Sequence, residues 1–208
     1  MSDFENALQR VLLAEGGWSD HPLDRGGETI FGISRKYHPT WDGWKLLDTL
    51  RRRATVVGGA PGFPQSAERD PMLLGWVRQF YFTEFWTPIS GDTIPPPRLA
   101  SALFSIAVVS GVTTAVKFLQ DGLNTLAMDG SGQQRYRLLQ VDGVCGPNTQ
   151  QAIRDHYTPG RLDRTRDPLT WHVIALWTAR CAEIIRHDPT QGVFARGWLN
   201  RAMGMWDG

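Results

Sequence analysis

The 208-residue chain holds 41% hydrophobic and 21% charged residues, which excludes a disordered tail and allows one large domain or two small ones. Its net charge is +1, with a balance of −3 in residues 1–50 and +4 in the remainder. A net charge near zero and the absence of a nucleic-acid recognition motif argue against a nucleic-acid binder. We expect no membrane insertion, because no apolar run is long enough to span a bilayer, and the acidic start of the chain lacks an export signal.

Apolar residues between Phe4 and Leu12 recur at three- and four-residue spacing, which predicts a helix over residues 3–15. Gly16 and Gly17 should end this helix. Residues 18–34 are rich in turn-forming residues and predict an irregular β-hairpin, with a turn at Gly26-Gly27. Residues 55–70 are expected to form a connecting loop, and residues 67–86 a second helix.

The proline-rich stretch 93–97 is the best candidate for a boundary between two lobes, 1–95 and 96–208. The second lobe is predicted to be helical, and its turn at 141–149 leads into a helix that has Pro147 at its first position. The fold class is therefore α+β, mainly α, with a small β-hairpin near the N-terminus. The expected helices beyond the boundary are 98–110, 112–127, 147–157, 168–187 and 191–204.

Cys145 and Cys181 are the two cysteines of the chain. Without metal-type spacing they suggest free thiols in a reducing compartment, with a single disulfide as the alternative. The five histidines are scattered without the pairing of a zinc motif, so we expect neither a metal nor an organic cofactor.

The strongest candidate site begins at Glu15, where the first predicted helix ends. A turn with glycines at 16, 17, 26 and 27 follows, and it carries a second carboxyl group, Asp24, and a hydroxyl group, Thr29. General acid–base cleavage of a glycosidic bond needs a pair of carboxyl groups and polar groups that hold a water. Taken singly, each residue has a simpler interpretation: a surface glutamate, a turn aspartate and a strand threonine.

The ordered set in residues 15–33 resembles the N-terminal signature of the glycoside hydrolase family 108 lysozymes, which are bacterial and phage N-acetylmuramidases. That signature reads Glu-Gly-Gly-aromatic and then Pro-x-Asp-x-Gly-Gly-x-Thr-x-x-Gly-Ile. Further similar segments follow at 77–81, 85–86 and 197–201, and the motif Asp142-Gly143-x-x-Gly146-Pro147-x-Thr149 resembles the peptidoglycan-binding region that accompanies the family. The resemblance covers nearly the whole chain.

The resemblance implies a lysozyme-like, two-lobed fold in which residues 1–95 form the glycoside hydrolase lobe and residues 96–208 a peptidoglycan-binding-like lobe of the same cleft. It implies Glu15 as the catalytic acid. Asp24 and Thr29 complete the predicted catalytic set, and the aromatic candidates for substrate binding are Trp18, Phe31 and Tyr81.

The predicted activity is hydrolysis of the β-1,4 bond between N-acetylmuramic acid and N-acetylglucosamine. Two alternatives stay open: a lytic transglycosylase, and a non-catalytic peptidoglycan-binding or secretion-activator protein. The expected setting is a monomeric phage endolysin that is made in the cytoplasm, reaches the wall through holin holes and acts as an antimicrobial; delivery by a secretion machine is the other route. The sequence departs from relatives at Ser105 and Val109, where Asp and Asn are usual.

Overall fold

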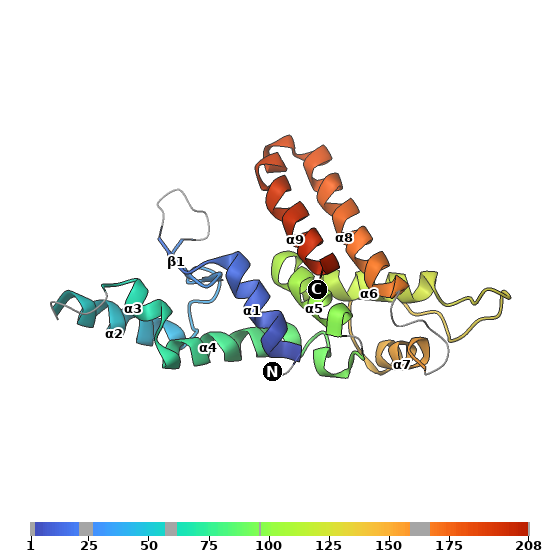
Figure 1. Ribbon diagram of the computed structural model, residues 1–208, viewed down its shortest axis with the longest axis horizontal. Coiled ribbons are helices and arrows are strands. Elements are labelled where there is room, and N and C mark those ends of the chain that lie inside the picture. Colours follow the sequence, from blue (N-terminus) through green and yellow to red (C-terminus); the bar gives the residue numbers. More distant parts are fainter. Residues whose placement is uncertain (1–2, 21–26, 57–61, 96, 159–166, 208) are drawn as a thin grey trace. The chain divides into compact units, whose positions relative to one another are not determined.

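The computed structural model describes residues 3–20, 27–56, 62–95, 97–158 and 167–207. The chain divides into two compact units, one formed by residues 8–83 and the other by residues 1–7 together with 84–208. Figure 1 shows the elements of each unit. The lobes predicted at 1–95 and 96–208 stay a prediction.

The first unit contains most of helix α1 (Asp3–Glu15) and a three-stranded antiparallel sheet of β1 (Trp18–Ser19), β2 (Thr29–Ile30) and β3 (Ile33–Ser34). Both the helix over 3–15 and the small β element are therefore confirmed. The predicted turn at Gly26-Gly27 lies partly outside the described residues. The sheet and the helices of this unit share a buried apolar core, whose members include Ile30, Ile33, Leu47, Leu73 and Val77.

Among its described residues this unit also contains helices α2 (Gly43–Val56), α3 (Gln65–Glu68) and α4 (Pro71–Tyr81). The predicted loop at 55–70 is wrong at both ends, because α2 runs to Val56 and α3 begins at Gln65. The helix predicted over 67–86 is also divided. Asp70 caps a new helix at Pro71 by accepting hydrogen bonds from the N–H groups of Met72 and Leu73, both at 2.9 Å. After Tyr81 the chain continues as the π-helix η1 (Phe82–Trp86).

The second unit is built around helix α5 (Pro97–Ser110). This helix is buried on nearly all sides, and its residues are mostly apolar, as such burial requires. Phe4, Trp86 and Phe104 form an aromatic cluster beside it, with ring centroids 5.4–5.8 Å apart. The other elements are η2 (Gly91–Thr93), α6 (Val112–Thr125), α7 (Pro147–His156), α8 (Pro168–His187), η3 (Pro189–Phe194) and α9 (Ala195–Asp207).

Helices α8 and α9 run side by side as a hairpin (Figure 1). The helix predicted over 168–187 is confirmed at both ends, since Asp167 caps it and Pro168 starts it. The helix predicted over 191–204 begins instead as the 3-10 turn η3, and α-helix starts only at Ala195. None of the helices in the described ranges is long and apolar enough to cross a membrane.

Two sequence features of the second unit have a structural account. Cys145 and Cys181 are free thiols, as the sequence suggested, and burial raises the pKa of both. Ser105 receives a hydrogen bond from Nη1 of Arg201 on α9 at 3.4 Å, and Val109 is 37% exposed. Ser105, at the position where the resemblance led us to expect Asp, thus faces a guanidinium group.

Candidate active site

Glu15 is the last residue of α1 and is half-buried. Leu8 and Val11 bury the inner face of the helix, which fixes its last turn. The helix ends because Gly16 adopts a left-handed conformation, φ +78°, while its N–H still donates to the carbonyl of Leu12 at 3.2 Å. The carboxyl group of Glu15 is thereby held at a rigid helix end.

The turn between β2 and β3 consists of two residues, Phe31 and Gly32, which link the paired residues Ile30 and Ile33. Both turn residues have positive φ, 48° and 77°, as a type I′ hairpin requires. Glycine adopts this conformation freely, whereas a phenylalanine does so only where its surroundings hold it. Here the hydroxyl of Tyr81 donates to the carbonyl of Phe31 at 2.7 Å and anchors the turn.

Three elements meet at Gly32. A Cβ atom built on this residue would lie 2.9 Å from the hydroxyl oxygen of Tyr81 and 3.0 Å from Oε2 of Glu15. The end of α1, the β2–β3 turn and the end of α4 therefore place the Glu15 carboxyl, the Phe31 backbone and the Tyr81 hydroxyl around one point. Three of the six predicted site residues come together in this way.

The other predicted residues lie elsewhere or beyond the described ranges. Thr29 is half-buried on β2, and its register partners across the sheet are Ser19 and Ser34, so three hydroxyl residues stand in one row. Asp24 falls in residues 21–26, outside the described residues. Its position relative to Glu15 stays a prediction.

Trp18 is held from several sides by the first unit. Its indole Nε1 donates to Oε1 of Glu28 at 2.9 Å, and the ring of Phe63 meets it edge-on at 4.9 Å. Its backbone N–H donates to Oε1 of Glu68 at 2.8 Å. Gly17 has no room for a side chain, because a Cβ atom there would overlap the Glu68 carboxylate. These contacts fix the chain directly after Glu15. The role of Trp18 in substrate binding stays a prediction.

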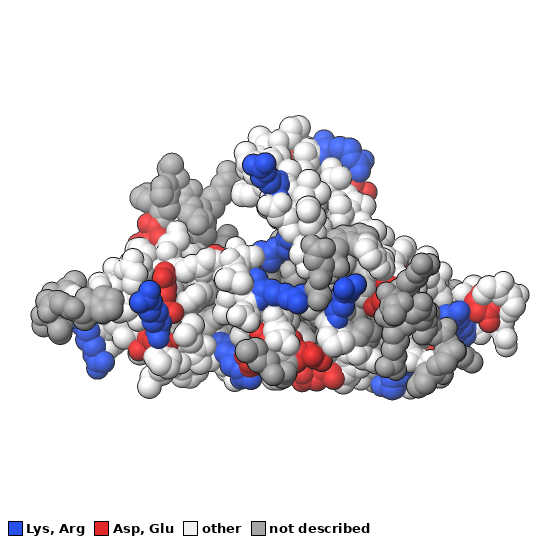
Figure 2. All heavy atoms as spheres, in the orientation of Figure 1, with Lys and Arg blue, Asp and Glu red and all other residues white. Residues whose placement is uncertain are grey.

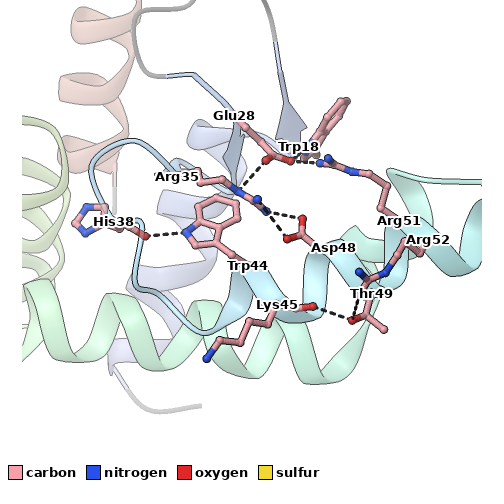
Figure 3. A network of polar contacts seen from close by, with 10 residues as sticks. All are labelled: Trp18, Glu28, Arg35, His38, Trp44, Lys45, Asp48, Thr49, Arg51 and Arg52. Atoms are coloured by element: carbon pink, nitrogen blue, oxygen red, sulfur yellow. Dashed lines mark hydrogen bonds and ion pairs between the residues drawn. The ribbon is translucent and has the colours of Figure 1, made fainter.

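An ion network that the sequence did not indicate, drawn in Figure 3, links residues beside the sheet to α2. Glu28, whose side chain is 11% exposed, pairs with Arg51 and with Nε of Arg35 at 2.9 Å. Arg35 also binds both carboxylate oxygens of Asp48 on α2, at 2.6 and 3.3 Å. The hydrogen bond that Arg35 donates to Asp48 raises the pKa of Arg35 despite its partial burial, so this guanidinium stays charged.

The network clamps the strand that carries Thr29 onto α2. Glu28 directly precedes Thr29, and the guanidinium of Arg35 covers the ring of Trp44, 4.7 Å from its centroid. The only hint in the sequence is the position of Glu28 between the paired glycines and Thr29. Its partners lie 7 to 23 residues away, at distances that no local pattern reveals.

Charge on the surface shows no single-sign field in the view of Figure 2, where Lys and Arg are interspersed with Asp and Glu over each unit. Within the ranges that the structure describes, no group of three or more His, Cys, Asp or Glu side chains is arranged to hold a metal ion. The chemistry available around Gly32 is that of a carboxyl group beside a fixed hydroxyl and a strained backbone turn.

Comparison with known proteins matches the sequence to two families. Residues 8–111, half of the chain, match the family described as glycosyl hydrolase 108, and residues 114–203 match a family described as a predicted peptidoglycan domain. No protein of curated function matches the chain significantly. Among solved structures, SagA of Brucella abortus is 24% identical, with 97% of this chain and 90% of SagA covered and a TM-score of 0.57.

The likeness to SagA concerns the fold, and it confirms the predicted α+β class, mainly helical with a small sheet. The two family matches support a lysozyme-like role in peptidoglycan degradation, with peptidoglycan as the substrate or partner. The chain belongs to the glycosyl hydrolase 108 family.

Proposed function

We propose that the chain is an N-acetylmuramidase that hydrolyses the β-1,4 bond between N-acetylmuramic acid and N-acetylglucosamine, with Glu15 as the general acid. One observation carries this proposal: the Glu15 carboxyl is held at the end of α1 against the Phe31–Gly32 turn, inside the segment that matches the glycosyl hydrolase family. A fixed carboxyl group is what proton donation to a leaving glycosidic oxygen requires.

The second half of the reaction is assigned from the sequence motif. Once Glu15 has protonated the leaving oxygen, Asp24 activates a water molecule as general base, and the hydroxyl of Thr29 orients that water. Attack by water on the face opposite the acid inverts the anomeric carbon. We therefore expect Asp24→Asn to lower activity more than Thr29→Ala, because the carboxylate takes the proton whereas the hydroxyl only positions the water.

Replacement of Glu15 by Gln tests the proposal. The amide keeps the shape of the side chain but cannot give up a proton, so clearing of permeabilised bacterial cells should fall by ~10²–10⁴-fold. Glu183→Gln on the exposed side of α8 is the matched control and should clear like the wild type. If Glu15→Gln keeps more than about a tenth of wild-type clearing, given the size of that general-acid effect, Glu15 is not the acid.

Two alternatives are separated by different measurements: the transglycosylase by its products, and the non-catalytic protein by the absence of clearing. A lytic transglycosylase uses the hydroxyl of the muramic acid itself and releases 1,6-anhydro products, lighter by one water, whereas hydrolysis leaves reducing-end muramic acid. Mass spectrometry of digested peptidoglycan distinguishes them. A non-catalytic peptidoglycan-binding or secretion-activator protein would bind the wall without clearing it. The second carboxyl group in the motif favours hydrolysis.

The proposed setting follows the same resemblance. We propose that the chain acts as a monomeric phage endolysin, an antimicrobial lysin released by a holin. Co-expression with a holin in bacteria should cause lysis that neither protein causes alone within the same period. Light scattering of the purified chain should give the mass of a monomer, 23.3 kDa.

A further inference from the structure

The second unit contains a pocket of about 530 Å³, a volume within the range of small-ligand sites. Helices α6 and α7 form two of its sides, and the extended segment 136–144 forms the third. We call it the α6–α7 pocket. It lies wholly within residues 114–203, which match the predicted peptidoglycan domain.

The buried side-chain amide of Gln120 fixes the segment that lines this pocket. Gln120, 1% exposed, donates from Nε2 to Oδ1 of Asp142 at 2.8 Å and to Oγ1 of Thr149 at 3.1 Å, and its Oε1 accepts from the N–H of Gly143 at 2.9 Å. The motif that begins at Asp142 is therefore wrapped around Gln120. Gly143 has φ +82°, and a Cβ atom there would lie 2.8 Å from the carbonyl oxygen of Thr113, so glycine is required.

The lining of the pocket carries both signs of charge. Asp142 and Asp155 supply carboxylates, and Arg137 supplies a guanidinium group. Hydrogen bonds from Gln120 and from the N–H of Val144 lower the pKa of Asp142, which keeps it ionised at neutral pH. Asn148 and Gln151 add side-chain amides, and Gln151 donates to Oδ1 of Asp155 at 2.9 Å.

The aromatic content of the lining argues against a sugar ring as the ligand. Tyr136 is the one aromatic among the described residues that line the pocket; it is 8% exposed, and its hydroxyl donates to the carbonyl of Leu123 at 2.8 Å. It therefore offers no open face on which a sugar could stack. A ligand with separate positive and negative groups matches the charges better.

We propose that the α6–α7 pocket binds the peptide stem of peptidoglycan, not its glycan: Asp142 and Asp155 take the free ammonium group of a diamino acid, and Arg137 takes a carboxylate of the same peptide. The choice of ligand rests on the proposed function. Charge-assisted hydrogen bonds of this kind are the stronger ones in proteins, and they recognise a zwitterionic peptide at two points. The pocket would thereby bind the peptidoglycan while the first unit cleaves its glycan.

The test uses the free tetrapeptide L-Ala-γ-D-Glu-diaminopimelate-D-Ala, which contains no bond that a glycosidase cleaves, and the full-length wild-type chain. Titration should shift the side-chain amide NMR signals of Asn148 and Gln151. Asp155→Asn, nearly isosteric, should weaken binding by about tenfold or more, as should acetylation of the side-chain amine of diaminopimelate. Arg137→Gln should have a similar effect. The matched controls are Asp121→Asn and Arg180→Gln, exposed residues outside the pocket.

Each outcome decides the question. If the peptide causes no shift at Asn148 and Gln151, or if Asp155→Asn binds it as the wild type does, the proposal is overturned, and so it is if peptide-free glycan shifts the same signals more strongly. A chain that binds the peptide but never clears a cell wall would overturn the proposed hydrolysis alone. A chain that clears walls without binding the peptide would overturn this inference alone. Circular dichroism of each variant establishes that it is folded.

Discussion

Glu15 and Gly32 are packed so closely that a Cβ atom on Gly32 would lie 3.0 Å from Oε2 of Glu15 and 3.1 Å from its Cβ. The glycine is thus required twice, once for its left-handed backbone and once for the space that the carboxyl group occupies. The β2–β3 turn sets the position of Glu15 from one side, and α1 sets it from the other.

Gly32→Ala should therefore impair both stability and activity. A left-handed alanine costs about 1 kcal/mol, and the displaced carboxyl group should lower wall clearing by roughly 10–100-fold. Gly75→Ala is the matched control, because Gly75 is exposed in the middle of α4 with no atom within 4 Å of a new Cβ. That change should stabilise the fold by up to about 1 kcal/mol. Wild-type clearing by Gly32→Ala would show that the close packing does not position the acid.

The Glu28 network should contribute far more to stability than an exposed ion pair does. Glu28→Gln leaves Arg35 and Arg51 without their shared carboxylate, and we expect a loss of about 2 kcal/mol in the free energy of unfolding. Asp42→Asn removes a pair of similar length, 2.7 Å to Lys45, whose side chains are 54% and 85% exposed. That loss should stay below about 1 kcal/mol. Urea denaturation compares the two; equal losses would contradict a structural role for the network.

The sequence predicted best those elements whose signals are local. The helix at 168–187 was predicted to the residue, because Asp167 and Pro168 mark its start and charged residues follow its last apolar ones. The helix predicted at 67–86 begins too early, because its apolar spacing starts only at Leu73 and the capping Asp70 starts the helix at Pro71. Helix α2 was not predicted at all, although it carries Asp48 and Arg51 of the network.

The site was predictable in composition but not in geometry. Glu15 stood out because a motif surrounds it, and the glycine at 32 belongs to that motif. Nothing local indicates that Tyr81, 50 residues away, donates to the carbonyl of Phe31, or that Phe31 adopts a positive φ. Such contacts depend on the packing of α4 against the sheet, which only the folded chain provides.

The boundary predicted at residue 95 leads to a test of independence. Phe4 packs against Trp86 and Phe104, with ring centroids at 5.4 and 5.8 Å, so the N-terminal residues belong to the same unit as α5. A fragment of residues 1–95 loses Phe104 and exposes the rest of this cluster. We expect it to be unfolded or inactive by circular dichroism and clearing assays. A soluble, active fragment would show that residues 1–95 fold alone.

The last prediction concerns His156, which is 1% exposed in the second unit. The hydroxyl of Tyr136 donates to Leu123 and lies 3.2 Å from Nδ1 of His156, so we assign the Nδ1 proton to this contact. Burial raises the pKa of Tyr136 to about 12, so the hydroxyl keeps its proton at every pH considered. Among the described residues Nε2 of His156 has no partner, and a second proton there would find no acceptor.

Burial accordingly lowers the pKa of His156 below its ordinary value of 6.5, with the carboxylate of Asp167 opposing this effect and Arg135 adding to it. The unfolded chain then binds more protons near pH 6 than the folded chain does. The neutral form of His156 therefore stabilises the fold fully above pH 6.5. This stabilisation is lost as the pH falls from 6.5 toward the pKa of His156 in the folded chain. Urea denaturation between pH 7.5 and pH 5.5 should give a smaller decline in unfolding free energy for His156→Gln than for the wild type. The control is His187→Gln, which changes an exposed histidine at the end of α8; its unfolding free energy should decline with pH as that of the wild type does. If the unfolding free energy of all three proteins declines equally with pH, His156 is protonated in the fold without cost.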